Sequence, residues 1–309
     1  MRVAVVDIGT NSTRLLIDDV DRAGTVSVLD RRSRVTRLGA GVDASGRLAD
    51  EAIERVLRTL DEYAVAIERH GAQARPAVLT SAVRDAANGA DFVATVERRY
   101  GLQARAIPGR EEAHLTYLGA AGARAHCAGG PTLVIDVGGG STELIVGSGR
   151  QVDFAVSMQA GVVRQSERHL HDDPPSCPQL DAVGTEVAAT IESSVPEAVR
   201  RSARRAIAVA GTATACAAID QALDPYDPDR VHGYRVELTT LRLLLARLAA
   251  LDLAERRHVK GLDPERAPTI VAGVIILARV LEAFGLDGFE TSEHDILWGV
   301  ALTTAGAAG

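Results

Sequence analysis

The feature that most constrains this chain is a glycine-rich turn that occurs twice. The segments 7-DIGTNSTRLLI-17 and 136-DVGGGSTELIV-146 align without a gap, and five of their eleven positions are identical. Each copy follows an apolar stretch that ends in aspartate and precedes a second apolar stretch, which is the pattern of a β-hairpin. The copies differ most sharply at Arg14 and Glu143. At 309 residues the chain exceeds the usual size of one hydrophobic core, so the repeat predicts two domains.

Strand and helix patterns alternate along both halves of the chain, which is typical of an α/β fold. The glycine-bearing stretch 126-HCAGGP-131 is interpreted as a linker. The prediction is therefore an N-terminal domain over 1–125 and a C-terminal domain over 126–309. Strands are expected at 2–7, 13–20, 76–80, 103–107, 132–136, 142–147, 151–157 and 206–210, and helices at 50–71, 90–101, 111–125, 184–195, 238–252, 265–285 and 295–306.

The composition argues against several classes of protein. A formal net charge of −7 is unlike that of a general nucleic-acid binder, which usually carries a basic surplus. The longest apolar stretch, 270–284, contains two charged residues and is shorter than the ~20 residues that span a bilayer. The first residues lack the pattern of a signal peptide, so a cytoplasmic location is expected. Cys127, Cys177 and Cys216 lie too far apart to suggest a disulfide framework or a zinc site.

The two glycine turns predict a site for phosphate. Glycine lets backbone N–H groups converge on one point, because a Cβ would block close approach or the φ > 0 geometry. One such turn is usually a plain hairpin, but two matching copies are hard to explain by chance. The candidate phosphate-binding residues are Gly9, Ser12 and Thr13 in the first copy and Gly138, Gly139, Gly140, Ser141 and Thr142 in the second.

Asp7 and Asp136 each end an apolar strand, where a carboxylate without a partner would be costly. Either residue alone could simply cap its own turn. Together they favour a divalent cation, because Mg²⁺ is usually held by one or two carboxylates while it contacts phosphate oxygens and water. The exchange of Arg14 for Glu143 then suggests that the first hairpin supplies a cation for the phosphate and the second a further metal ligand.

Five segments, in order, resemble the exopolyphosphatase/guanosine pentaphosphate phosphohydrolase family of the actin-like ATPase and sugar kinase superfamily. They are 7-DIGTNSTRLL-16, 80-TSAVRDAANG-89, 109-GREEAHLTYLGA-120, 136-DVGGGSTELIVG-147 and 211-GTATACAAI-219. The resemblance covers essentially the whole chain. It implies an α/β fold of two ribonuclease H-like (actin-like ATPase) domains, with the active site in an interdomain cleft.

The resemblance also assigns catalytic and metal-binding roles. It implies that Glu112 is the catalytic base, although from the residues alone Glu112 is better explained as an acid in the first turn of a helix, a role that Glu111 fills equally well. It makes Asp136 and Glu143 the ligands of a Mg²⁺ or Mn²⁺ ion, with Asp7 as a further candidate ligand.

Other positions of the resemblance concern phosphate. Asn11, Ser12, Arg14 and Arg84 fall on phosphate-contacting positions of the family. The pair Gly211 and Thr212 begins a helix directly after a strand, which suits a phosphate, although in nucleotide-binding members of the superfamily this region contacts adenosine. The segments around Pro268 and over 292–299 depart from the family's pattern, and no role is assigned to them.

The expected activity is metal-dependent hydrolysis of terminal phosphate from inorganic polyphosphate. The same residues would serve guanosine pentaphosphate, and an ATP-dependent kinase of the same superfamily or a polyphosphate sensor without turnover are the further alternatives. A homodimer is expected. The acidic balance, and the absence of Lys and Arg from 286–309, predict a preference for short polyphosphates, because long chains need continued basic contacts.

Overall fold

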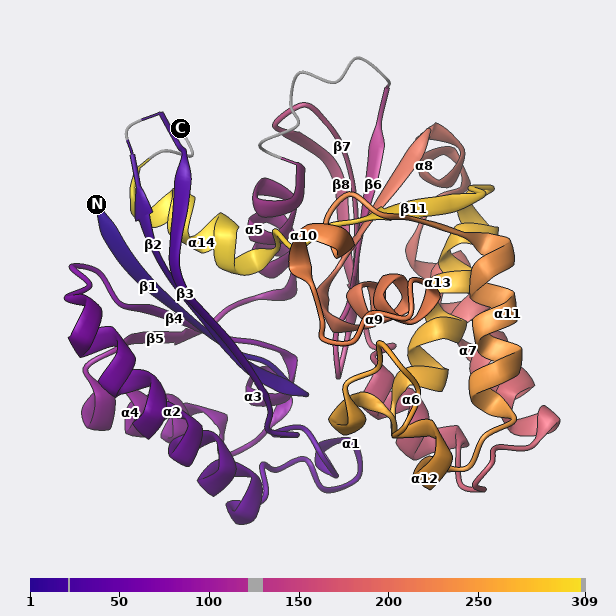
Figure 1. Ribbon diagram of the computed structural model, residues 1–309, viewed down its shortest axis with the longest axis horizontal. Coiled ribbons are helices and arrows are strands. Elements are labelled where there is room, and N and C mark those ends of the chain that lie inside the picture. Colours follow the sequence, from indigo (N-terminus) through magenta and orange to yellow (C-terminus); the bar gives the residue numbers. More distant parts are fainter. Residues whose placement is uncertain (22, 122–129, 307–309) are drawn as a thin grey trace. The chain divides into compact units, whose positions relative to one another are not determined.

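The computed structural model describes residues 1–21, 23–121 and 130–306 of the chain (Figure 1). The chain divides into two compact units. The first unit comprises Met1–Gly119 together with Asp295–Gly309, and the second comprises Ala120–His294. Each unit contains its own β-sheet and its own core.

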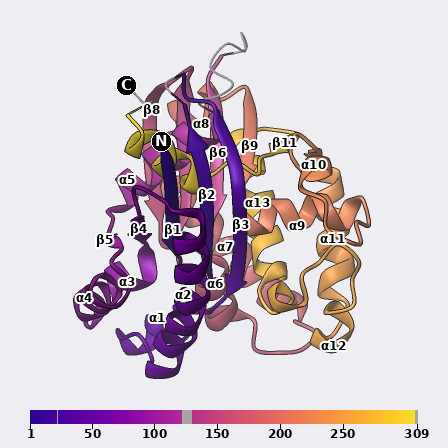
Figure 2. The same ribbon diagram turned by 60° about the vertical axis from the view of Figure 1, so that its left-hand side comes forward.

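The first unit has a five-stranded sheet in the order β3-β2-β1-β4-β5. The strands are β1 (Arg2–Ile8), β2 (Ser12–Val20), β3 (Val26–Val35), β4 (Pro76–Leu79) and β5 (Gln103–Ala106). The first three form an antiparallel meander, visible side by side in Figure 2, and β4 and β5 run parallel to β1. The glycine turn is the connection between β1 and β2.

Helices cover both faces of this sheet. They are α1 (Val42–Ser45), α2 (Asp50–His70), α3 (Ser81–Asp85), α4 (Gly89–Tyr100), α5 (Gly109–Ala121) and α14 (Ile296–Thr304). The helix α2 buries Val56, Leu60 and Tyr63 at helical spacing and ends at Gly71, whose φ of 64° suits glycine. On the opposite face, α14 packs against β1 and β2 through an apolar cluster that includes Leu297.

The second unit has a six-stranded sheet in the order β10-β11-β9-β6-β7-β8. The strands are β6 (Thr132–Val137), β7 (Thr142–Ser148), β8 (Gln151–Met158), β9 (Arg205–Val209), β10 (Arg235–Glu237) and β11 (Gly288–Thr291). The β6–β7–β8 part is antiparallel, whereas β9 and β11 run parallel to β6. The edge strand β10 is antiparallel to β11.

Helices of the second unit are grouped around one buried helix, α13 (Ile270–Phe284), which contacts α6, α7, α9 and α11. The others are α6 (Val162–His169), α7 (Cys177–Ser194), α8 (Glu197–Ser202), α9 (Ala210–Asp220), α10 (Pro228–Val231), α11 (Leu238–Ala249) and α12 (Leu253–Arg256), with a 3₁₀ turn η2 (Pro264–Arg266) before α13. No helix in the described part of the chain is long and apolar enough to cross a membrane.

The two sheets repeat one topology. The order β3-β2-β1-β4-β5 in the first unit matches β8-β7-β6-β9-β11 in the second, with the same strands antiparallel and parallel. The duplicated turn is therefore part of a duplicated sheet. This arrangement confirms the predicted α/β class with two ribonuclease H-like units.

The division of the chain differs from the predicted one in its last residues. The prediction gave all of 126–309 to the second domain, whereas α14 belongs to the first unit. The reason is packing, because Ile296, Leu297 and Val300 are buried in the cluster over β1 and β2. The predicted boundary between residues 125 and 126 lies outside the described residues.

The helices α5 and α14 approach each other backbone to backbone. A Cβ on Gly119 would lie 1.9 Å from the carbonyl oxygen of Asp295, and one on Gly299 would lie 1.8 Å from that of Leu115. Only glycine fits such contacts. The two places where the chain passes between the units, after Gly119 and before Asp295, are therefore fastened together within the first unit.

Candidate active site

The first glycine turn is held by the segment that follows β3. The carbonyl of Asn11 accepts from the N–H groups of Thr36 and Arg37 at 3.0 and 2.9 Å, and the carbonyl of Thr10 accepts from Gly39 at 2.8 Å. A Cβ on Gly39 would lie 2.2 Å from the Thr10 side chain. These bonds turn the carbonyls toward that segment, as is needed if the turn's amides are to face an anion.

The second glycine turn is held in the same way by the start of α6. The carbonyls of Gly138 and Gly139 accept from Val162 and Val163 at 2.9 and 2.8 Å. The carbonyl of Gly140 accepts from Arg164 Nε at 3.0 Å. A Cβ on Gly161 would lie 2.3 Å from the Gly139 carbonyl oxygen, so Gly161 is required for this contact.

Gly39, Gly161 and Arg164 support the two turns, and sequence reasoning missed them. Their position in the sequence, after the third strand of each sheet, could have indicated them. The segments 36-TRLG-39 and 158-MQAGVV-163 both follow the third strand of their sheet, which is where the chain returns to its own turn.

The hydroxyls predicted to meet phosphate separate into two groups. Thr13 and Thr142 have no exposed surface, and their hydroxyls bond inside the unit: Thr13 Oγ1 to Thr36 Oγ1 at 2.9 Å, and Thr142 Oγ1 to the Ala160 carbonyl at 2.6 Å. They fasten the turns, which differs from the predicted phosphate contact. Ser12 is partly exposed, whereas Ser141 donates to Glu143 Oε1 at 2.7 Å.

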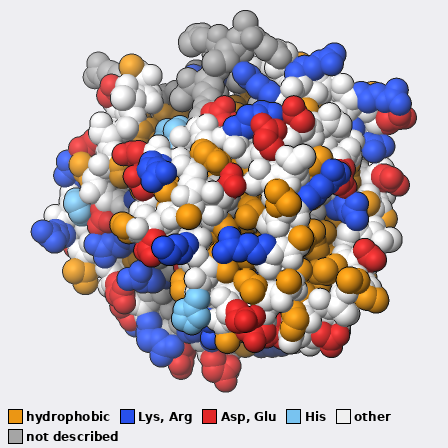
Figure 3. Space-filling model, turned by 45° about the vertical axis from the view of Figure 1, so that its right-hand side comes forward, with side chains coloured by type: hydrophobic (Ala, Val, Ile, Leu, Met, Phe, Trp, Pro, Cys, Tyr) orange, Lys and Arg blue, Asp and Glu red, His pale blue; other side chains and the backbone are white. Residues whose placement is uncertain are grey.

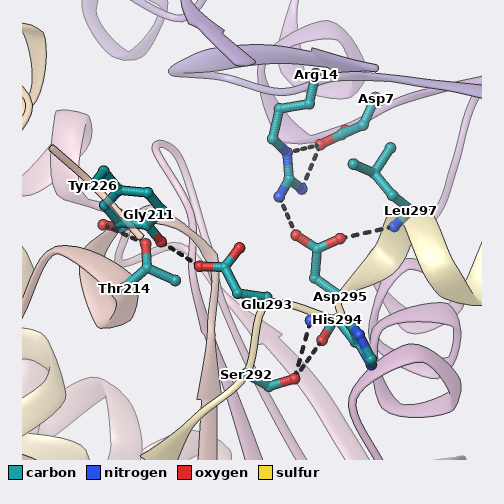
Figure 4. Close-up of polar contacts among 10 residues, drawn as sticks. All are labelled: Asp7, Arg14, Gly211, Thr214, Tyr226, Ser292, Glu293, His294, Asp295 and Leu297. Carbon is teal, nitrogen blue, oxygen red and sulfur yellow. Dashed lines mark hydrogen bonds and ion pairs between the residues drawn. The ribbon is translucent and has the colours of Figure 1, made fainter. Parts of the chain in front are cut away.

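Asp7 and Arg14 face each other across the first hairpin as partners in the β1–β2 ladder. Nε and Nη2 of Arg14 donate to Asp7 Oδ2 at 2.8 and 2.6 Å. Nη1 of Arg14 donates to Asp295 Oδ2, and Asp295 Oδ1 accepts from Leu297 N at 3.0 Å, which caps α14 (Figure 4). Burial raises the pKa of Asp7, and the opposing effect of Arg14 does not cancel it. Asp295 was not predicted from the sequence.

Asp136 and Glu143 occupy the corresponding ladder position in the second hairpin. Side chains that lie directly opposite in an antiparallel pair share one face of the sheet, with Cβ atoms about 5 Å apart. Glu143 is 1% exposed, and its Oε1 accepts from the hydroxyls of Ser141 and Ser157 at 2.7 and 2.6 Å. The structure thus brings the two predicted metal ligands together and holds one by two hydroxyl donors.

These residues fit a hard divalent cation. Carboxylate oxygens are the ligands that Mg²⁺ prefers, and one or two of them suffice when water and phosphate complete the shell. Asp7 is partly engaged, because Arg14 binds its Oδ2, whereas Asp7 Oδ1 is buried with no hydrogen-bond partner. Among the described residues no cluster of three or more His, Cys, Asp or Glu side chains forms a self-sufficient metal site.

Glu112 lies in the first turn of α5, directly after β5, and is 7% exposed. Arg84 Nη1, from α3, donates to Glu112 Oε2 at 3.2 Å and to the Ile107 carbonyl at 2.9 Å. The neighbouring Glu111 instead pairs with Arg105 at 2.5 Å, which lowers the pKa of Glu111. The two acids of the pair are thus separated, with Glu112 buried and Glu111 turned to the surface.

The first turn reaches the element that carries Arg84. Thr10 Oγ1 lies 3.3 Å from Ser81 Oγ and accepts from Ala82 N at 3.1 Å, both at the start of α3. Asn11, the residue that follows Thr10 in the sequence, is also buried. The first unit therefore gathers its predicted site residues at the carboxyl ends of β1, β4 and β5, where ligands bind in open α/β sheets.

Gly211 and Thr212 lie in the first turn of α9, which begins at Ala210 at the carboxyl end of β9. Thr212 is buried closely against α13. A Cβ on Gly273 of that helix would lie only 2.5 Å from the methyl group of Thr212. A Cβ on Gly211 would lie 1.7 Å from Arg266 Nη1, so a guanidinium covers this end of the helix. Arg266 was not predicted, and its place near the helix N-terminus adds positive charge where an anion is favoured.

Comparison with known proteins gives a consistent result. Residues 16–304 match the Ppx/GppA phosphatase family. The chain is 39% identical to Exopolyphosphatase 2 of Mycobacterium tuberculosis, with 99% of each chain covered. It is 30% identical to Exopolyphosphatase 1 of Mycobacterium bovis, with 98% of this chain and 88% of the relative covered.

Solved structures agree with these relatives. A crystal structure of an exopolyphosphatase-like protein is 36% identical, with a TM-score of 0.91 and 99% of each chain covered. The Ppx/GppA family member of Aquifex aeolicus is 30% identical, with a TM-score of 0.82 and coverage of 99% and 97%. Fold, repeated turns and relatives over nearly the whole length lead to one conclusion: the chain belongs to the Ppx/GppA phosphatase family.

Proposed function

We propose that the chain is an exopolyphosphatase that hydrolyses the terminal phosphate of inorganic polyphosphate with the help of a divalent metal. The observation that carries the proposal is the position of Glu112. It is a buried carboxylate held by Arg84 at the start of α5, in a chain 39% identical to a protein named exopolyphosphatase.

In this proposal Glu112 accepts a proton from the attacking water, and the water oxygen forms a bond to the terminal phosphorus. The bond between that phosphorus and the bridging oxygen breaks, and the shortened chain leaves with the bridging oxygen. Arg84 donates a hydrogen bond to the Glu112 carboxylate and fixes its direction. A carboxylate fixed in this way can be aimed at an attacking water.

The glycine turns bind and orient the substrate. Their carbonyls are held on the side of the supporting segments, and the amides of Gly9 and Gly138 donate to the carbonyls of Ser12 and Ser141 at 2.9 and 3.0 Å. The other amides of the turns would serve phosphate oxygens. Asp136 and Glu143 would hold Mg²⁺ or Mn²⁺, and the ion would offset the negative charge of the transferring phosphoryl group. Ser141 and Ser157 orient Glu143 for that task.

Phosphate release tests the proposal directly. Tripolyphosphate, a long polyphosphate, guanosine pentaphosphate and ATP would each be incubated with the protein in Mg²⁺, in Mn²⁺ and in a chelator. Glu112→Gln serves as the blank and Glu111→Gln as the matched control. Release from polyphosphate that needs metal and Glu112 supports the proposal, whereas release from guanosine pentaphosphate alone would replace its substrate.

Two outcomes would replace the activity itself. Transfer of labelled phosphate from ATP to an acceptor would identify a kinase. Tight binding of polyphosphate in Mg²⁺ without any release would identify a sensor. A homodimer stays a prediction, which sedimentation of the purified protein tests.

The side chains visible in Figure 3 intersperse acidic and basic groups. This pattern suits a substrate bound in a local site better than a nucleic acid bound on a broad surface.

A further inference from the structure

Three parallel strands of the second unit end along one edge of its sheet. Asp136 lies at the end of β6, Gly211 follows β9, and Glu293 follows β11. The pairing of β11 with β9 fixes the place of Glu293. Thr291 lies opposite Ala208, and Ser292 N donates to the Ala208 carbonyl at 2.9 Å. Since neighbouring strands are about 4.8 Å apart, Glu293 lies about two strand spacings from Asp136, on the far side of Gly211.

The charges along this edge change sign twice. Asp136 and Glu143 are acidic and suit a metal. The N-terminus of α9, with Arg266 against Gly211, is positive. Glu293 is negative again. The positive part of the edge is therefore short and is closed on its far side by a carboxylate.

Glu293 is fixed in this place by its neighbours. It is 7% exposed, and its Oε1 accepts from the Tyr226 hydroxyl, toward which it points in Figure 4. Its backbone N–H donates to His232 Nδ1 at 3.1 Å. A carboxylate held in this way cannot swing aside at little cost, and its partial burial strengthens its repulsion of a nearby phosphate.

We propose that Glu293 is a specificity-determining residue that limits how many phosphates the second unit accepts. The inference rests on the proposed function. The terminal phosphate would lie near Asp136 and the next ones near the N-terminus of α9, and a longer chain would bring further negative charge against Glu293. Short polyphosphates end before this point and avoid the repulsion.

Glu293→Gln tests the inference, because glutamine has nearly the same shape and still accepts a hydrogen bond from Tyr226, but carries no charge. The measured quantity is the ratio of kcat/KM for a long polyphosphate to kcat/KM for tripolyphosphate. We expect this ratio to rise about tenfold in Glu293→Gln. An unchanged ratio would overturn the inference.

Two control variants separate charge from packing. Tyr226→Phe removes the hydrogen bond that holds Glu293 but keeps the Glu293 charge, so it should raise the ratio by less than Glu293→Gln does. Asp287→Asn removes one negative charge at the opposite end of β11, where Asp287 is exposed and pairs with Arg235, and it should leave the ratio unchanged. A rise in either control equal to that in Glu293→Gln would also overturn the inference.

A binding measurement distinguishes this inference from the proposed function. Calorimetry gives the Kd of tripolyphosphate and of the long polyphosphate for the native protein and for Glu293→Gln, whether or not hydrolysis occurs. If the native protein releases no phosphate, the proposed function fails, but a Kd ratio that shifts toward the long chain in Glu293→Gln still supports the role of Glu293. If phosphate is released and neither the Kd ratio nor the kcat/KM ratio changes, the function stands and the inference fails.

Discussion

Arg14 and Glu143 occupy the same ladder position in two copies of one hairpin, Arg14 opposite Asp7 and Glu143 opposite Asp136. In the first copy the opposite charges form a partly buried ion pair that Asp295 extends. In the second copy two carboxylates lie on the same face, which favours a cation between them and the substrate. One exchange of charge thus gives two related turns different electrostatic environments.

Glu112→Gln should lower kcat by roughly 10²–10⁴, because general-base assistance is typically of that size. The glutamine cannot accept the proton but can still accept from Arg84, so binding should change little. Steady-state phosphate release measures kcat, and calorimetry with tripolyphosphate measures binding. Glu111→Gln, whose carboxylate faces Arg105, should retain most of kcat, and the assignment is wrong if Glu111→Gln is the inactive variant.

Arg14→Ala should destabilise the first unit. It leaves Asp7 and Asp295 buried without their shared cation, a change that typically costs about 3–5 kcal/mol and lowers the temperature of unfolding. Thermal unfolding followed by circular dichroism measures the effect. Asp295→Asn is the milder comparison, because asparagine still caps α14. An unfolding temperature in Arg14→Ala equal to that of the native protein would show that this ion pair adds nothing.

Glu143→Gln should raise the metal concentration needed for half-maximal phosphate release. It removes one of two carboxylates but leaves an oxygen that Ser141 and Ser157 can still bond. Ser157→Ala should shift the same titration in the same direction by less, typically within the 10–100-fold range seen when a group that supports a metal ligand is removed. Metal titrations of both variants, compared with Arg14→Lys, test this. Identical curves in all three would contradict the division of roles.

Asp18, on β2, should make the protein less stable as the pH rises toward neutrality. Its side chain is fully buried with no hydrogen-bond partner for either oxygen. Burial, with a smaller contribution from Asp19, raises the pKa of Asp18 to about 7. The folded state therefore holds a proton that the unfolded state loses near pH 4, so stability falls between about pH 4 and pH 7, by up to about 4 kcal/mol.

Asp18→Asn removes this dependence and checks it. Free energies of unfolding from urea titrations at pH 5 and pH 8 would be compared between the native protein and Asp18→Asn. Relative to the native protein, Asp18→Asn should have a free energy of unfolding that is raised more at pH 8 than at pH 5. An equal difference at the two pH values would show that Asp18 does not titrate in this range.

Gly161→Ala should disturb the second turn without a change in charge. The added methyl group would lie 2.3 Å from the Gly139 carbonyl oxygen, so α6 or the turn must move. We expect KM for tripolyphosphate to rise, because the turn's amides lose their positions. Gly285→Ala, at a helix end with open space around it, controls for a general loss of stability, and a KM unchanged in Gly161→Ala would contradict the supporting role.

The local sequence determined the class of fold and the repeated hairpin. Apolar strands that end in aspartate, followed by glycine and a second apolar strand, have only short-range requirements, and 7–17 and 136–146 satisfied them twice. The fold class and the family that the motifs implied are confirmed. The catalytic role of Glu112 and the metal-binding roles of Asp136 and Glu143 stay predictions. The structure shows only that Arg84 holds Glu112 and that two serine hydroxyls hold Glu143.

Only the tertiary structure decided which distant residues complete the turns. Asp295 reaches Arg14 across 281 positions of sequence, and the strand β11 that leads toward it is only four residues long, too short for a clear periodic signal. The sequence also did not show that the chain returns to the first unit in α14. By its composition alone, an apolar helix could pack into either core. Which core it enters depends on close packing against Gly119 and Leu115, and such contacts exist only once both helices are in place.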